Sequence, residues 1–177
     1  MEFLKYKQFG AYHWKQYADN TKYTRHADRV KEWVKEKNVL DIGAGDGLIT
    51  SLLGAKGIEY EQEGVRLAQE KGADVIQGDA YHLPFTDNSF EAVTMIDVLE
   101  HFKFPERALQ EAKRVAKIIY IVTPPKKDDG TLTDPYHYIE WSPEGLRKVV
   151  EKEGFALDGG ILVYPKEKMM YSRFIRT

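Results

Sequence analysis

The sequence contains no cysteine. This absence excludes disulfide bridges, thiolate metal sites and any mechanism with a cysteine nucleophile. Long apolar runs are missing too, because no stretch approaches the roughly 18 residues that a membrane helix needs. The first ten residues, "MEFLKYKQFG", carry charges where a signal peptide has its apolar core. We therefore expect a cytoplasmic protein that does not bind membranes.

A strong excess of one charge is missing as well. The chain has 26 Lys and Arg residues against 28 Asp and Glu residues, which gives a formal net charge of -2 at pH 7. This balance argues against a broad basic surface that holds long nucleic acid through its phosphates, although a local basic patch is still allowed. With 177 residues, the chain is long enough for one domain with a sizeable core.

Short apolar runs alternate with amphipathic stretches along residues 38–177. Strands are expected at 38–42, 57–61, 73–79, 90–96 and 117–123, and helices lie between them. Residues 156–177 should form two further strands that "PKEK" joins into a hairpin. The pattern predicts an α/β fold: a doubly wound, mostly parallel seven-stranded sheet with a C-terminal antiparallel hairpin and helices on both faces.

The stretch "VLDIGAGDG" places three glycines at alternating positions directly after the first expected strand. Glycine lets a ligand lie against the main chain, and ligands of doubly wound sheets bind beyond the carboxyl ends of the strands. The dinucleotide fingerprint is G-x-G-x-x-G, whereas here Leu48 stands at the position of its third glycine. No Gly-Lys-Ser/Thr follows, so a phosphate loop is also disfavoured.

Together with its later motifs, this turn resembles that of the class I S-adenosylmethionine-dependent methyltransferases, and the resemblance runs from Asn38 to Thr177. The family's acidic residue and G-x-G-x-G are matched by Asp41, Gly43, Gly45 and Gly47. Its acid at the end of the second strand aligns on Glu59, with Glu61 as a rival, and its "GDA" aligns on residues 78–80. Because Glu59 follows the glycine turn closely, the first helix or the second strand must be short.

The resemblance implies that S-adenosylmethionine is the cofactor. It implies that Glu59 binds the two ribose hydroxyls and that Asp79 accepts a hydrogen bond from the adenine amino group. The "DVLEH" after the fourth strand is typical of the branch that contains ubiquinone-biosynthesis-type methyltransferases. The implied cofactor-binding residues are Asp41, Gly43, Ala44, Gly45, Gly47, Glu59, Asp79, Ala80 and Ile96.

The family implies methyl transfer to an O or N atom of a small-molecule acceptor, which should approach over the ends of the fourth and fifth strands. Candidate catalytic residues there are Asp97, His101 and His137. A base is needed only where the acceptor must lose a proton to attack. Alternatively, Asp97 caps the following turn and His101 satisfies backbone groups. Candidates for the acceptor pocket are the aromatic residues Tyr12, Trp14, Tyr23, Tyr136, Tyr138 and Trp141.

A second resemblance concerns "DVLEHF", "TPP" and "HYIEW". It is to small-RNA ribose 2'-O-methyltransferases, in which an acid-x-x-Glu-His and a later His ligate a divalent metal. The corresponding residues are Asp97, Glu100, His101 and His137, a donor set that suits Mg, Mn or Zn. No metal is preferred, since Asp replaces the usual first Glu and no wider RNA-binding domain is recognisable. A metal-dependent RNA methyltransferase and a non-catalytic cofactor-binding scaffold remain the alternatives.

Residues 1–37 stand apart from the alternating pattern. They have helical potential and an unusual density of Tyr, Trp and His. They form either a covering helix whose aromatic rings pack on the sheet or a lid over the site at the glycine turn. We expect one methyltransferase domain over residues 1–177, with 1–37 as cap or lid and 38–177 as a Rossmann-like core.

Overall fold

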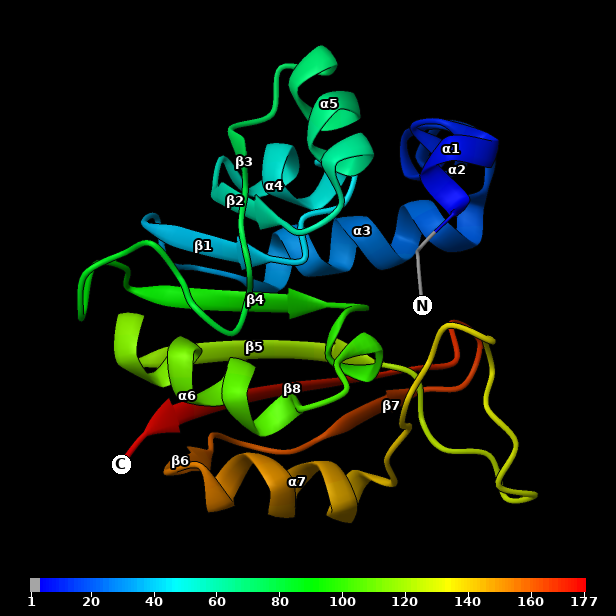
Figure 1. The fold of residues 1–177 in the computed structure, drawn as a ribbon. Helices are drawn as coiled ribbons and strands as arrows, with labels where there is room; N and C mark the ends of the chain where they lie inside the picture. Colours follow the sequence, from blue (N-terminus) through cyan, green and yellow to red (C-terminus); the bar gives the residue numbers. More distant parts are fainter. Residues whose placement is uncertain (1–3) are drawn as a thin grey trace.

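The computed structural model describes residues 4–177, in which eight strands form one mixed sheet of order β3-β2-β1-β4-β5-β8-β6, with β7 pairing β8 (Figure 1). The strands are β1 Val39–Ile42, β2 Lys56–Glu59, β3 Val75–Gln77, β4 Ala92–Ile96, β5 Ile118–Thr123, β6 Phe155–Leu157, β7 Leu162–Tyr164 and β8 Met169–Arg176. The first five run parallel, and β8 is antiparallel to β5. The expected α/β fold is confirmed.

The C-terminal strands differ from the expected hairpin in one detail. Both β6 and β7 pair with β8, at Phe174–Arg176 and Met169–Tyr171 respectively. They share one edge of β8, since β5 occupies the other edge. Residues 158–161 interrupt the strand, and Gly159 has a φ of 86° that favours glycine. The two segments therefore occupy one position of the sheet, which keeps the seven positions that the sequence predicts.

Helices cover both faces of the sheet. They are α1 Lys5–Phe9, α2 Tyr12–Asp19, α3 Thr21–Trp33, α4 Leu48–Leu53, α5 Gln62–Glu70, α6 Pro105–Val115 and α7 Pro143–Lys152. In β5, Ile119 and Ile121 face a core shared with α6 and α7, whereas Tyr120 and Val122 face α3. This alternation explains the continuous apolar run of β5, because a central parallel strand is buried on both sides.

The connection from β1 to β2 is short, as the position of Glu59 requires. Helix α4 has six residues and β2 has four. Gly47 begins α4 with a φ of 79° and Gly54 ends it with a φ of 61°, so the helix is bounded at both ends by left-handed glycines. This compact unit brings the glycine turn and the end of β2 to the same edge of the sheet.

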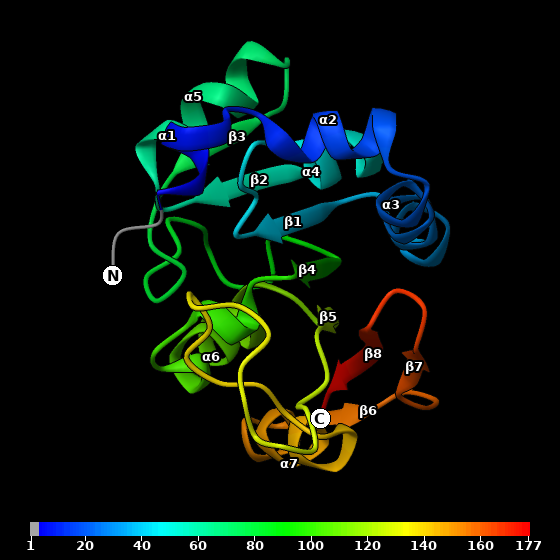
Figure 2. The same cartoon turned by 90° about the vertical axis from the view of Figure 1, so that its right-hand side faces the viewer.

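The N-terminal helices divide between two places. Helix α3 packs on the sheet through Val30, whereas α1 and α2 lie at the edge where the parallel strands end (Figures 1 and 2). The long loop 124–141, yellow in Figure 2, lies at the same edge on the other side of β4. No helix in residues 4–177 has the length and apolar character to cross a bilayer.

Candidate active site

A cavity of about 800 Å³ lies at the carboxyl ends of the parallel strands, between α1–α2 and the 124–141 loop. Its wall includes most of the sequence-predicted site residues, namely Asp41, Gly43, Ala44, Gly45, Glu59, Asp79, Ala80, Ile96, Asp97, Glu100, His101 and His137. Among the six aromatic candidates, four line it: Tyr12, Tyr23, Tyr136 and Tyr138. Gly47, Trp14 and Trp141 do not.

The three glycines of the turn have different surroundings. Gly43 and Gly45 have positive φ angles of 74° and 56° and face the cavity. A Cβ on Gly45 would collide with the Tyr6 hydroxyl of α1. A Cβ on Gly47 would instead lie 2.6 Å from the Ala73 Cβ. The first two glycines thus line the cavity and let Val98 and Tyr6 approach the turn, and the third lets Ala68 of α5 pack against the start of α4.

Glu59 ends β2 and aims its carboxylate at the glycine turn. Its Oε2 accepts a hydrogen bond from the Gly45 N–H at 2.8 Å, and its Oε1 accepts one from the Glu61 N–H at 2.8 Å. Burial raises the pKa of Glu59, and these two N–H groups act in the opposite direction. Glu61 lies at the N-terminus of α5 and lines the same cavity. Of the two rival acids, Glu59 is the one fixed at the strand end.

Asp41 connects three elements beneath the turn. Its two carboxylate oxygens accept hydrogen bonds from the hydroxyls of Thr50 in α4, at 2.7 Å, and Thr94 in β4, at 2.8 Å. Burial raises the pKa of Asp41 to about 6, although both hydroxyls act to lower it. The side chain therefore ties β1, α4 and β4 together.

We expect Asp41 to make the protein less stable as pH rises from about 4 to 6. A carboxyl whose pKa is raised on folding contributes its full stability below its unfolded pKa and loses it as pH passes the folded pKa. At about 1.4 kcal/mol per pKa unit, the loss is about 2–3 kcal/mol. Urea unfolding of wild type and Asp41→Asn at pH 4.5, 5.5 and 6.5 measures this loss of unfolding free energy. If the difference in unfolding free energy between the two proteins does not change with pH, the prediction is wrong. Asp74→Asn, at an exposed aspartate, serves as the control.

Asp79 lies just after β3 and lines the same cavity as the glycine turn. Its Oδ1 accepts a hydrogen bond from the Tyr81 N–H at 2.8 Å, and its side chain is 42% exposed. Ala80 follows it in the same wall. This acid is therefore oriented by the backbone yet open to a ligand.

Asp97 follows β4 with a backbone φ of 53°, which is unusual for a residue other than glycine. Its N–H donates to the Val122 carbonyl at 2.8 Å. Its Oδ2 lies 3.1 Å from Nε2 of the buried His26 in α3, without the alignment of a hydrogen bond. The turn at Leu99–His101 has no side-chain cap, so Asp97 does not cap it. Sequence reasoning missed His26, because only packing of α3 brings it to β4.

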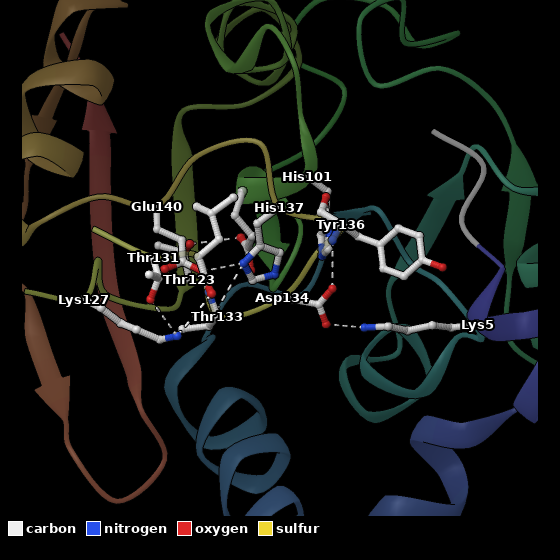
Figure 3. Close-up of polar contacts among 12 residues, drawn as sticks. Lys5, His101, Thr123, Lys127, Thr131, Thr133, Asp134, Tyr136, His137 and Glu140 are labelled. Atoms are coloured by element: carbon white, nitrogen blue, oxygen red, sulfur yellow. Dashed lines mark hydrogen bonds and ion pairs between the residues drawn. The ribbon is translucent and has the colours of Figure 1, made fainter. Parts of the chain in front are cut away.

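Glu100, His101 and His137 lie together, with one potential ligand atom of each within 4.8 Å of the others. The Nδ1 of His101 is 3.1 Å from the Tyr136 carbonyl oxygen, and the Nδ1 of His137 is 2.6 Å from a Glu140 carboxylate oxygen (Figure 3). Both partners are acceptors, so each Nδ1 carries a proton. Asp97, the fourth member of the predicted metal set, lies outside this cluster.

Burial lowers the pKa of His101 and so favours its neutral form. Glu100 is 1% exposed, and its Oε2 accepts a hydrogen bond from the Thr123 hydroxyl at 3.0 Å. Burial raises the pKa of Glu100, and the nearby Asp97 carboxylate raises it further. We call this part of the cavity, formed by Asp97, Glu100, His101 and the 124–141 loop, the acceptor end.

Helices α1 and α2 make polar contacts with both sides of the cavity. On one side, the His13 N–H donates to the Asp46 carboxylate at 3.0 Å, and the Trp14 indole N–H donates to the Asp46 carbonyl at 2.8 Å. On the other side, the Lys5 ammonium lies 2.5 Å from Asp134 of the loop (Figure 3). Asp46, an acid between two glycines of the turn, was a sequence signal that could have indicated such an anchor.

Residues 40–118 match the family model described as a methyltransferase domain. A solved structure from Thermotoga maritima, described as a SAM-dependent methyltransferase and possible histamine N-methyltransferase, covers 97% of this chain and 98% of its own. The TM-score is 0.79 at 20% identity. The chain thus contains a segment that matches a methyltransferase domain, and its fold is that of this SAM-dependent methyltransferase structure.

Curated relatives match a part of this chain. The demethylmenaquinone methyltransferase of Thermotoga maritima is 34% identical over 106 residues, which is 53% of this chain and 46% of the relative. A probable tRNA methyltransferase 9B of Mus musculus is 31% identical over 98 residues, 51% of this chain and 22% of the relative. The chain thus spans less than half the length of these relatives. The family match ends at β5, before the 124–141 loop.

Proposed function

We propose that this methyltransferase transfers the methyl group of S-adenosylmethionine to an O or N atom of a small-molecule acceptor. One observation carries the proposal: a single cavity joins the glycine turn, Glu59 and Asp79 to the acceptor end. The Thermotoga maritima relative is named for a quinone acceptor, which supports a small molecule. Action in the cytoplasm stays a prediction.

The residues around the turn fit the cofactor. Gly43 and Gly45 line the cavity, Glu59 offers carboxylate oxygens for the ribose hydroxyls, and Asp79 is open to the adenine amino group. Ala44, Ala80 and Ile96 supply apolar wall, and Asp41 and Gly47 act by holding the turn in shape. When bound, S-adenosylmethionine supplies an already activated methyl group, so the protein has mainly to align the acceptor and exclude water.

Asp97, His101 and His137 are the proposed catalytic residues at the acceptor end. The Asp97 carboxylate is partly exposed, and the two imidazoles line the same cavity. Each is suited to receive a proton from an acceptor that must lose one. Their contribution depends on the acidity of the acceptor.

Calorimetric titration with S-adenosylhomocysteine tests the cofactor site, and methyl-labelled S-adenosylmethionine with a panel of small hydroxyl and amine compounds tests transfer. We expect one-to-one binding and label transfer to a small molecule. Absence of cofactor binding would overturn the proposed function. Binding without transfer to any compound of a broad panel would instead support the scaffold alternative.

We further propose that α1 and α2 form a lid over the cofactor. Lys5→Ala and Asp134→Asn should each speed both association and dissociation of S-adenosylhomocysteine by about threefold, since a partly exposed ion pair contributes up to about 1 kcal/mol. Stopped-flow fluorescence of Trp14, which contacts Asp46, reports the motion. Lys15→Ala is the control, because the Lys15 ammonium of α2 donates a hydrogen bond to the Phe9 carbonyl of α1 and so does not join the helices to the 124–141 loop. Unchanged rates in both variants would argue for a fixed cap.

The cluster of Glu100, His101 and His137 favours a second candidate, metal-assisted transfer to a ribose hydroxyl of RNA. Metal-bound histidines usually donate their other N–H to a carbonyl or carboxylate, as both histidines do here. A bound divalent ion would lower the pKa of the acceptor hydroxyl. The mouse relative's description as a probable tRNA methyltransferase is compatible with this candidate.

If the metal candidate is correct, calorimetry will show binding of one Mn²⁺ or Zn²⁺ per chain, and EDTA will abolish RNA methylation. Glu140→Gln should weaken metal binding about tenfold or more, because it replaces the carboxylate that orients His137 with an uncharged amide. His82→Ala, at an exposed histidine, is the control. Full activity in EDTA would exclude a required metal.

A further inference from the structure

Two carboxyl groups at the acceptor end have no lysine or arginine partner among the ion pairs of residues 4–177. Asp134 is paired with Lys5, and Glu167 lies 3.6 Å from Arg29. Glu100 has a hydroxyl partner, and Asp97 contacts only an imidazole. The remaining lysines of the wall, at positions 22, 103 and 168, are exposed. The acceptor end therefore has carboxyl groups in its interior, and the lysines lie at its rim.

His26 lies between Tyr171 and Asp97. Its Nδ1 is 2.6 Å from the Tyr171 hydroxyl oxygen, and its Nε2 is 3.1 Å from Asp97 Oδ2. Burial raises the pKa of Tyr171, so this hydroxyl carries no charge. The group that contacts Asp97 is therefore an imidazole and not a lysine or an arginine.

The oxygen of Asp97 that faces the cavity is Oδ2. The other oxygen, Oδ1, is buried and has no hydrogen-bond partner among the described residues, whereas the side chain as a whole is 29% exposed. The left-handed backbone at φ 53° holds the side chain in this position. A ligand in the cavity can therefore reach Asp97 Oδ2, the oxygen that His26 contacts.

Aromatic rings line the same cavity as this carboxylate. The His13 ring lies between those of Tyr12 and Tyr23, at centroid distances of 3.9 and 5.7 Å. Burial raises the pKa of both tyrosines, and the carboxylates of Asp97 and Asp46 raise both further. Protonated phenol rings next to a carboxylate are the combination that binds organic ammonium ions, through ring faces and opposite charge.

We propose that the acceptor is an organic amine, which binds as a cation with its nitrogen beside Asp97 and its apolar part against the cavity wall that includes Tyr12 and Tyr23. This inference rests on the proposed methyl transfer to a small molecule. Asp97 takes one proton from the ammonium group, and the freed lone pair attacks the methyl carbon as the carbon–sulfur bond breaks. The bonding electrons stay on sulfur, the product leaves as a methylated ammonium ion, and the proton on Asp97 passes to solvent.

Three probes of similar shape and different charge test the inference: tyramine, p-ethylphenol and p-hydroxyphenylpropionate. Calorimetry is done with saturating S-adenosylhomocysteine, which lacks the sulfonium charge, and with EDTA so that only protein charges act. We expect tyramine to bind at least about tenfold more tightly than p-ethylphenol, and the anion to bind most weakly. Equal affinities, or a preference for the anion, would overturn the proposal.

Asp97→Asn identifies the source of the preference. Asparagine tolerates the left-handed backbone, so the variant should fold and keep its affinity for S-adenosylhomocysteine. We expect it to bind tyramine and p-ethylphenol equally, whereas Glu61→Gln, at the other end of the cavity, keeps the preference. If Asp97→Asn retains the preference, Asp97 is not the anchor and the proposal fails. If wild type does not bind S-adenosylhomocysteine, the proposed function fails first, which separates the two results.

Discussion

Replacing Glu59 by Gln will weaken binding of S-adenosylhomocysteine by about 100-fold. Two hydrogen bonds from the ribose hydroxyls to a carboxylate contribute about 1.5 kcal/mol each, and 1.4 kcal/mol corresponds to a factor of ten. In the wild type, the Gly45 and Glu61 N–H groups donate to the two carboxylate oxygens. The substitution places an amide NH2 against one of these N–H groups. Calorimetric titration of both proteins measures the loss.

The matched control is Glu61→Gln, which changes the same chemical group two residues away. Glu61 lines the cavity, and its side chain does not cap α5. Its replacement should change the affinity by less than about threefold, as is usual for a partly exposed charge. Thermal unfolding of the ligand-free variants shows whether each retains its fold. Comparable losses in both variants would mean that the ribose is not held by Glu59.

Gly47→Ala will destabilise the protein by about 3 kcal/mol. A side chain at a φ of 79° costs about 1–2 kcal/mol in backbone strain. The new Cβ would also lie 2.6 Å from the Ala73 Cβ and 2.8 Å from the Ala68 Cβ, and such overpacking costs a further 1–3 kcal/mol or so. Urea unfolding monitored by circular dichroism measures the change.

Gly54→Ala isolates the backbone part of this cost. Gly54 ends the same helix with a φ of 61°, and nothing lies within 4 Å of a Cβ built there. Its replacement should cost only about 1–2 kcal/mol. If both variants lose the same stability, α5 moves away from Gly47 at no cost, and close packing is not the reason for that glycine.

Local patterns in the sequence were sufficient for the order of the elements and for much of the site. The apolar run of β5 predicts a strand buried on both faces, and the alternating glycines predict a ligand turn after β1. Glu59 and Asp79 follow the ends of strands, and parallel strands end at one edge of a sheet, so their meeting in one cavity follows from topology. The division of the last hairpin into β6 and β7 was not predicted, because it depends on how far each pairs along β8.

By itself, then, the sequence determined the α/β fold, the resemblance to a methyltransferase domain and the residues expected at the cofactor, because each depends on spacing within short segments. Tertiary structure alone decided which side chains complete the site. The contact of Tyr6 with Gly45, the ion pair of Lys5 with Asp134 and the approach of His26 to Asp97 join distant parts of the chain. Such contacts depend on how whole helices pack on the sheet, and the spacing of residues along the chain carries no record of that packing.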